Sequence, residues 1–280
     1  MYKFFFFLFV IAASPFSLEA EEDSDSFAER WQARATKTQA QQPKWAVPMV
    51  STFPMVAQVF RTDFTRQSPS AQVQNWNLGA GKGFNLIPFA RTQVDVLIPG
   101  FVKHGDRTPD GFGDVPWLVK YRLFAGNERH HDYIFSAILS GTVPTGSHTN
   151  GAATNVLTPT LSGGKGFGRF DVMSSLGAGL PTSKTETAGR TLHSNTVLQY
   201  HASKYLWPEL EMNSTRYIGG ARDGKTQTFL TPGLVVGKIA LHPENPKSRT
   251  GVVAGVAFQT AVTSFHTYNH AVVVSLRFAF

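Results

Sequence analysis

The sequence predicts a transmembrane antiparallel up-and-down β-barrel with twelve strands, of the kind found in bacterial outer membranes. Three observations predict it: a short secretory signal at the start, a series of two-faced segments separated by turn residues, and a closing strand that ends in phenylalanine. Charged residues make up 16% of the chain, below the roughly 25% of soluble domains. Strand counts of ten or fourteen also fit if one segment is miscalled or split.

Residues 1–20 have the form of a secretory signal peptide. A basic start ending at Lys3 precedes the apolar run 4–13, and Leu18-Glu19-Ala20 is a passable cleavage site. The apolar run is too short to span a bilayer, which needs roughly 20 residues. We therefore exclude this segment from the fold and expect an exported Gram-negative protein that crosses its membrane with strands.

Residues 21–50 are predicted to form a periplasmic leader, because they lack strand alternation. Ser26 and Glu29 have capping-box spacing, and Phe27 and Trp31 lie one helical turn apart, so a short helix is expected here. Two interpretations stay open. The leader is either mobile, or it folds back and plugs the mouth of the barrel.

Residues 51–280 are predicted to form the barrel. In the best segment Lys120 and Arg122 share one face, while Val119, Tyr121 and Leu123 share the other, a spacing that no helix explains. Prolines within the segments count against ordinary pairing, and bulges near the outer rim are expected to accommodate them. The predicted strands are 55–66, 73–84, 91–101, 114–123, 132–143, 156–165, 170–180, 191–204, 209–218, 226–239, 251–261 and 269–280.

The closing strand has one wholly apolar face, formed by Val272, Val274, Leu276, Phe278 and Phe280. Its other face is small or polar and carries Arg277. In an outer-membrane barrel the apolar face meets lipid, and the two phenylalanines lie at the membrane interface. This strand also resembles the signal by which the barrel-assembly machinery recognises its clients. A strand of a soluble sandwich is the alternative.

Composition excludes several classes of function. The chain has no cysteine, which removes thiol catalysis and cysteine metal sites. Its formal charge is +7, but no run of five or six Lys and Arg residues occurs, so nucleic acid is not an expected partner. His130 and His131 adjoin Asp132 in a predicted turn without zinc-ligand spacing. We expect no metal and no cofactor.

Charged residues on the polar faces are predicted to line the lumen. Both signs are present, whereas pores that screen by charge usually carry rings of one sign. We therefore expect internal ion pairs that brace a lumen much narrower than that of a general porin, with solute contact as the alternative role. The candidates are Arg61, Asp63, Asp95, Lys120, Arg122, Asp171, Glu211 and Arg277.

Several short motifs carry a family resemblance: residues 111–115 (GFGDV), 120–123 (KYRL), 144–146 (PTG), 208–213 (PELEMN) and 229–234 (FLTPGL). With these, most of the chain after about residue 50 resembles the outer-membrane barrels named for the meta-pathway of phenol degradation. The resemblance implies a transporter-like barrel that passes small organic solutes, including aromatic or hydrophobic ones. It implies no catalytic residues.

Two other functions are alternatives to a channel. An adhesive or structural barrel would use its loops, which are short for that role. Outer-membrane lipid hydrolases are twelve-stranded barrels with a Ser, His and Asn arrangement on the lipid-facing side, and His201, Ser203 and Asn213 have acceptable spacing. Residues 201–203 map near the periplasmic end, however, and no calcium-type carboxylate cluster accompanies them. We therefore expect a channel and not an enzyme.

Overall fold

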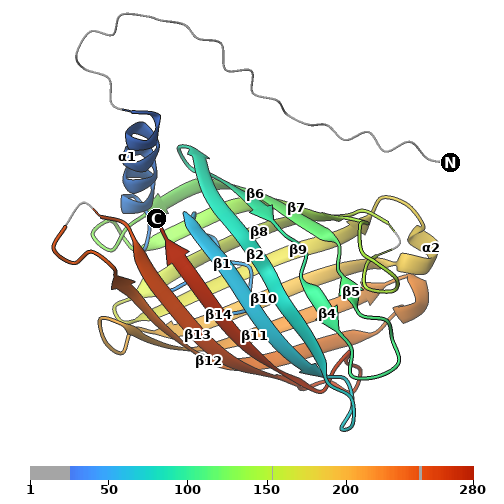
Figure 1. Cartoon of the computed structure of the whole chain (residues 1–280). Helices are drawn as coiled ribbons and strands as arrows, with labels where there is room; N and C mark the ends of the chain where they lie inside the picture. Colours follow the sequence, from blue (N-terminus) through green and yellow to red (C-terminus); the bar gives the residue numbers. More distant parts are fainter. Residues whose placement is uncertain (1–25, 153, 246–247) are drawn as a thin grey trace, which may run out of the picture.

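The computed structural model describes residues 26–152, 154–245 and 248–280, and the predicted signal segment 1–20 lies outside them. Most of the chain folds into a closed β-barrel (Figure 1). The helices are α1 (Phe27–Ala40), α2 (Thr185–Ala188) and the 3-10 turn η1 (Gly220–Arg222). The strands are β1 (Val59–Ser68), β2 (Asn75–Phe89), β3 (Thr92–Leu97), β4 (Phe101–Lys103), β5 (Gly111–Phe112), β6 (Val115–Gly126), β7 (Tyr133–Val143), β8 (Val156–Phe167), β9 (Phe170–Pro181), β10 (Arg190–Tyr200), β11 (Leu206–Ile218), β12 (Thr226–Ala240), β13 (Gly251–Ala261) and β14 (His270–Ala279).

The barrel has twelve antiparallel strands, as the sequence predicts. β3 and β4 both pair with β2, so they are two parts of one strand, interrupted at residues 98–100. β5 and β6 pair with β4 and β3 respectively and form the next strand in the same way. β1 pairs with both β2 and β14, which closes the sheet and removes its edges. This closure excludes the sandwich alternative.

The two faces of each strand differ as predicted. In β14 the side chains of Val272, Val274 and Phe278 are exposed on the outside, while Ser275 and Arg277 are buried inside. Large exposed apolar residues recur on the other strands in the same alternation. An apolar outer surface of this extent requires lipid as its solvent.

The end of the barrel that carries α1 and Phe280 is called the helix end, and the opposite end the loop end (Figure 1). Short turns at the helix end join β2 to β3, β6 to β7 and β8 to β9. Exposed aromatic rings gather beside them: Phe89, Phe124, Phe167 and Phe170. Such a belt is typical of residues that lie at a membrane–water interface.

Pro159 and Pro232 enter their strands without bulges, contrary to the prediction, whereas Pro88 of β2 lies at a register shift between Leu86 and Phe89. Pro159 pairs with Leu139 of β7, and Pro232 pairs with Leu210 of β11. On the other side of each proline the ladder has a gap, while the register before and after the gap is the same. The missing N–H is therefore accommodated by losing pairing to one neighbour only, and both rings point outward to the exposed face.

Several strand boundaries differ from the prediction: β2 runs on to Phe89 and not to residue 84, and β10 ends at Tyr200 and not at residue 204. The first strand begins at Val59 and not at residue 55, because residues 55–58 lie inside the barrel. The ninth begins at Leu206, so Trp207 and Pro208 belong to β11 and not to the preceding turn. Trp207 is buried inside the barrel, where it packs with Met49 of the interior, and this packing explains why the strand includes Trp207 and Pro208.

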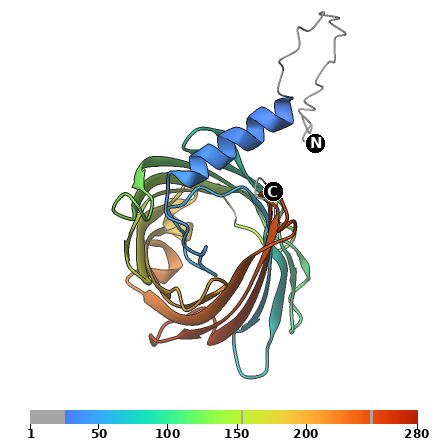
Figure 2. The same cartoon turned by 90° about the vertical axis from the view of Figure 1, so that its left-hand side faces the viewer.

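Helix α1 lies at the rim of the helix end of the barrel and extends outward from it (Figure 2). Ser26 and Glu29 form the predicted capping box, in which each side chain accepts a hydrogen bond from the other residue's backbone N–H. Ala35 of the helix packs with Val56 and Ile87, which anchors α1 to β2. No helix in the described ranges is long and apolar enough to cross a membrane.

Candidate functional site

Residues 41–58, called the inner segment, run from α1 into the lumen and return to the start of β1 (Figure 2). The segment contains no helix or strand, and Pro43, Pro48 and Pro54 interrupt it. Its backbone N–H and C=O groups therefore need partners outside regular structure. Side chains on the inner face of the barrel supply them from several sides.

On one side of the lumen, arginines donate to the carbonyls of the inner segment. Arg277 donates to the carbonyl oxygens of Val47 and, at 2.8 Å, of Pro48. Arg61 donates to the carbonyl of Met49 at 2.8 Å. Charge-assisted hydrogen bonds of this kind are the stronger ones in proteins. β14 and β1 thus hold the middle of the segment.

Across the lumen, β6 and β7 hold its second half. Lys120 Nζ donates to the carbonyl of Met55 at 2.8 Å and lies 3.7 Å from the centroid of the Phe53 ring. Ser136 Oγ donates to the carbonyl of Pro54 at 2.7 Å. The ammonium group is thus paired with a carbonyl dipole and an aromatic face inside a narrow space.

Glu211 of β11 accepts three hydrogen bonds from the inner segment. Its carboxylate accepts from the backbone N–H groups of Met49 at 2.8 Å, Val50 at 2.9 Å and Ser51 at 2.6 Å. Glu209 accepts from the Met49 N–H as well, at 3.0 Å. Three successive N–H groups on one carboxylate form an anion-binding turn, with the anion supplied by the barrel wall.

Apolar side chains complete the packing. Trp45 and Met55 of the inner segment form one cluster with Ile134, Met173 and Val197 of the wall. Met49 forms a second with Trp207, Val235, Ala257 and Val273. A water-filled lumen would not need apolar groups on its inner face. Their presence shows that this wall is built to contact protein.

Burial at this level is nearly complete. Lys120 is 1% exposed and Glu211 0%. Charged groups in an open aqueous pore would keep contact with water, and these have almost none. The inner segment therefore packs closely against the wall around these side chains.

The expected bracing by ion pairs is confirmed for one pair of candidates only. Among the described residues, Arg61 and Asp63 form the one ion pair inside the lumen, with 2.7 Å between Arg61 Nη2 and Asp63 Oδ2. Asp95 accepts from Gln93 at 2.7 Å, and Gln93 in turn accepts from the Ala57 N–H at 2.7 Å. The charges mostly serve the backbone of the inner segment and not one another.

Asp171, also among the predicted lumen residues, is 3% exposed, and its Oδ2 has no hydrogen-bond partner in the described part of the chain. It makes none of the contacts that hold the inner segment.

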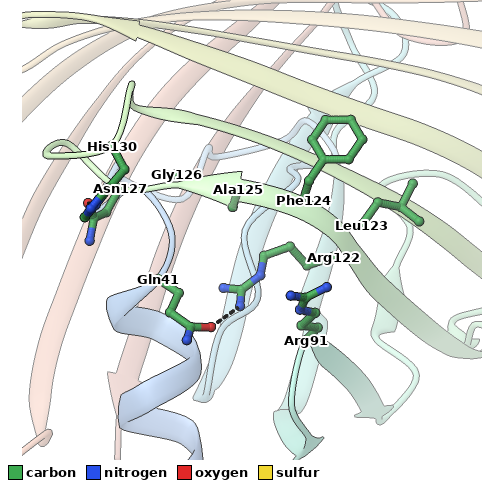
Figure 3. A pocket seen from close by; sticks show the side chains of 9 residues that line it. All are labelled: Gln41, Arg91, Arg122, Leu123, Phe124, Ala125, Gly126, Asn127 and His130. Carbon is green, nitrogen blue, oxygen red and sulfur yellow. Dashed lines mark hydrogen bonds between the residues drawn. The ribbon is translucent and has the colours of Figure 1, made fainter.

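Arg122 links α1 to the wall. It donates to the carbonyl of Thr38 at 2.6 Å and to the side chain of Gln41 at 3.2 Å, the dashed line in Figure 3. The carbonyls at a helix C-terminus carry partial negative charge, which a guanidinium complements. A pocket of about 370 Å³ lies beside this contact, and Arg91 and Asn127 also line it (Figure 3). The contact fixes the point where the chain turns into the lumen.

The predicted interface residues lie at the helix end. Phe278 is exposed on the outer face, as expected for a lipid-facing position. The Phe280 ring packs edge-on against Phe84, with 6.1 Å between centroids. The Phe280 carbonyl accepts from Gln58, whose own amide oxygen accepts from Trp31 of α1 at 2.7 Å. The last residue of the barrel is thereby joined to the inner segment and the helix.

The hydrolase candidates are not brought together. Asn213 faces the lumen and donates to Ser51 of the inner segment at 2.7 Å. His201 stacks on Trp207 with 3.9 Å between ring centroids, in the connection before β11. Ser203 is exposed in that same connection and bonds to neither of the other two residues.

The turn with the two histidines holds no metal-type cluster. In the ranges the structure describes, no group of three or more His, Cys, Asp or Glu residues is arranged to hold a metal ion. Glu128 instead accepts from the backbone N–H of Lys44 at 2.7 Å. Burial raises the pKa of the neighbouring Asp132 carboxyl. This turn contacts the inner segment where it enters the barrel.

No protein-family model matches the chain, and no curated protein matches it. Solved outer-membrane barrels resemble it in structure. The COG4313 outer membrane channel from Pseudomonas putida F1 has 13% identity over 84% of this chain and 98% of that chain, with a TM-score of 0.53. The NanC porin has 7% identity over 80% and 99%, with a TM-score of 0.48. The translocator domain of the autotransporter NalP from Neisseria meningitidis has 12% identity over 80% and 87%, with a TM-score of 0.45.

At 13% identity the first of these likenesses supports the fold alone, and the two lower TM-scores carry no argument. That fold, together with the apolar outer surface, places the chain in the bacterial outer membrane.

Proposed function

We propose that the chain is an outer-membrane channel for small organic solutes, closed in its resting state by the inner segment. The observation that carries this proposal is the use of the lumenal charges. Arg61, Lys120, Glu211 and Arg277 bind backbone groups of residues 47–55, contacts that water can replace when the segment leaves. A barrel whose interior served only to brace the wall would pair these charges with one another.

The inner segment can leave without unfolding the barrel. β1 begins to pair with β14 and β2 at Val59, after the segment ends, and no residue of 41–58 belongs to the sheet. The closed ladder therefore does not depend on it. In this proposal the helix end faces the periplasm, because outer-membrane barrels have short periplasmic turns and longer extracellular loops.

The resemblance to the phenol meta-pathway barrels belongs to this proposal too, as the source of the small organic solute class. The closing strand with Phe278 and Phe280 is proposed as the contact for the barrel-assembly machinery.

Flux into proteoliposomes tests the proposal. Vesicles that contain the full chain are expected to admit small neutral organic solutes faster than protein-free vesicles, and to exclude dextrans. The narrow twelve-stranded lumen sets this cut-off. If neither the full chain nor a variant without residues 27–57 admits any small solute, the protein is not a channel.

A further inference from the structure

A polar cavity of about 340 Å³ lies in the lumen on the loop side of the inner segment. Val50 and Thr52 of the inner segment contribute to its lining, and the rest comes from strands β7 to β13 and from the last loop. Small-molecule sites typically measure about 300–1,000 Å³. A solute that entered from the loop end would therefore meet this cavity before it met the inner segment.

The lining contains no Asp, Glu, Lys or Arg, and both ring nitrogens of its histidine, His193, are hydrogen-bonded to threonine hydroxyls, those of Thr191 at 2.8 Å and Thr215 at 3.3 Å. Hydroxyl and carboxamide groups dominate the lining. The wall that contacts the inner segment, in contrast, carries charged residues such as Lys120 and Glu211. A charged solute would lose its hydration in the cavity without finding a counter-charge, and an apolar solute would leave the hydroxyls and amides without partners. The lining therefore favours an uncharged solute with many hydrogen-bonding groups.

The polar groups are held in place by one another. Asn213 donates to Asn195 at 3.0 Å and accepts from Gln259 at 3.3 Å. Gln259 also donates to Thr231 at 3.1 Å and accepts from the Tyr268 hydroxyl. Groups that are ordered before a ligand arrives lose less entropy on binding.

Two hydroxyls on β8 remain available. Thr158 and Thr160 lie at alternate positions of the strand and face the cavity, and their hydroxyls make no hydrogen bond with the described residues. Across the lumen, the rings of Phe229 and Tyr268 are stacked with 4.4 Å between centroids. Phe229 is 3% exposed, so the aromatic surface that the cavity offers beside its free hydroxyls comes mainly from Tyr268.

We propose that this cavity binds a neutral polyhydroxylated solute with one or two sugar rings. Each hydroxyl of such a molecule both donates and accepts, as do the hydroxyls and carboxamides of the lining. Its C–H faces suit the ring of Tyr268. The inference deepens the proposed channel function, on which it rests for its biological meaning, and it narrows the solute class to carbohydrates and related polyols.

Calorimetric titration of the full chain tests this inference, in a detergent whose head group is not a sugar. The probes are glucose, maltose and mannitol, with glucuronate and glucosamine as charged analogues and phenol as an aromatic one. At least one neutral polyol is expected to bind, with its charged analogues and phenol weaker by roughly tenfold or more. Absence of binding by all three polyols, or equal or tighter binding of the charged analogues or phenol, overturns the inference.

A matched pair of variants locates the site. Thr158→Val with Thr160→Val removes both available hydroxyls with little change of shape, and is expected to weaken polyol binding roughly tenfold. Thr142→Val removes an inward hydroxyl outside the cavity and should bind like the parent. Far-ultraviolet circular dichroism confirms that both variants are folded. Polyol binding that the double variant leaves unchanged would contradict the assignment.

The flux assay separates this inference from the channel proposal. Polyol binding without flux of any solute would support the binding site and contradict the channel proposal. Solute flux without polyol binding would support the channel proposal and contradict the binding site.

Discussion

Removal of residues 27–57 is expected to turn a barrel that rarely conducts into one that conducts steadily. The deletion takes away α1 and almost all of the inner segment, and leaves every strand intact. The lumenal side chains that bound the segment, such as Lys120 and Glu211, then become hydrated. In planar bilayers we expect the mean current to rise roughly a hundredfold, as the population shifts from mostly closed to open.

A second deletion serves as the control. Removing residues 185–188 deletes α2 from an exposed connection at the loop end, keeps the flanking residues of that connection, and makes no change at the inner segment. That variant should stay as closed as the parent. If the barrel without residues 27–57 is equally silent, something other than the inner segment closes the lumen, and the proposed mechanism is wrong.

The substitution Glu211→Ala is expected to open the channel almost as far. It removes one carboxylate that accepts from three successive backbone N–H groups, those of Met49, Val50 and Ser51. Hydrogen bonds to charged groups contribute about 1.5–3 kcal/mol each. Water that hydrates the freed N–H groups offsets most of this free energy. A net destabilisation of the closed state by about 3 kcal/mol still shifts the closed-to-open ratio roughly 150-fold.

Two measurements check the predicted effect of Glu211→Ala. Single-channel recording gives the open probability, and trypsin should cut at Lys44 faster when the segment spends more time outside the lumen. Glu211→Gln keeps one acceptor oxygen and should fall between parent and alanine variant. Glu186→Ala, in the exposed α2, should behave like the parent. An alanine variant with parental open probability and parental cleavage would show that Glu211 does not hold the segment.

The architecture was predictable because each strand carries its own evidence. Lipid outside and a polar interior impose a period of two on every strand, and β14 obeys it at each position from Ala271 to Phe278. Exceptions to this period of two, which occur in β7, were informative as well. Ile134 and Ile138 break the polar alternation of β7 because they are buried inside the barrel, and Ile134 packs against the inner segment. An apolar residue on a lumenal face signals that protein fills the lumen there.

The lumenal charges were identified, but their partners were not. Side-chain spacing shows which way Lys120 or Arg277 points, and says nothing of a backbone carbonyl far away in the sequence. Residues 45–57 did hold a signal, since Trp45, Phe53 and other apolar side chains are crowded between prolines. A mobile periplasmic leader has no need of them.

The start of the first strand was predicted wrongly because the chain before it is buried in protein. The predicted first strand ran too far back because Met55 and Val56 read as the start of a strand, when they are packed in the interior. The gap in pairing beside Pro159 could not be predicted from the sequence either, because it depends on which neighbouring strand the missing N–H faces.

A reversible cross-link between the inner segment and the wall tests the central claim most directly. Ser51 and Asn213 are in hydrogen-bond contact, at 2.7 Å, and the chain has no cysteine to compete. Ser51→Cys and Asn213→Cys, in the Glu211→Ala background, can be bridged by a one-carbon bis-thiosulfonate reagent. We predict a channel that is open when reduced, closed when bridged, and open again after a reductant, while each single cysteine stays open throughout. A bridged channel that conducts as well as the reduced one would contradict the account.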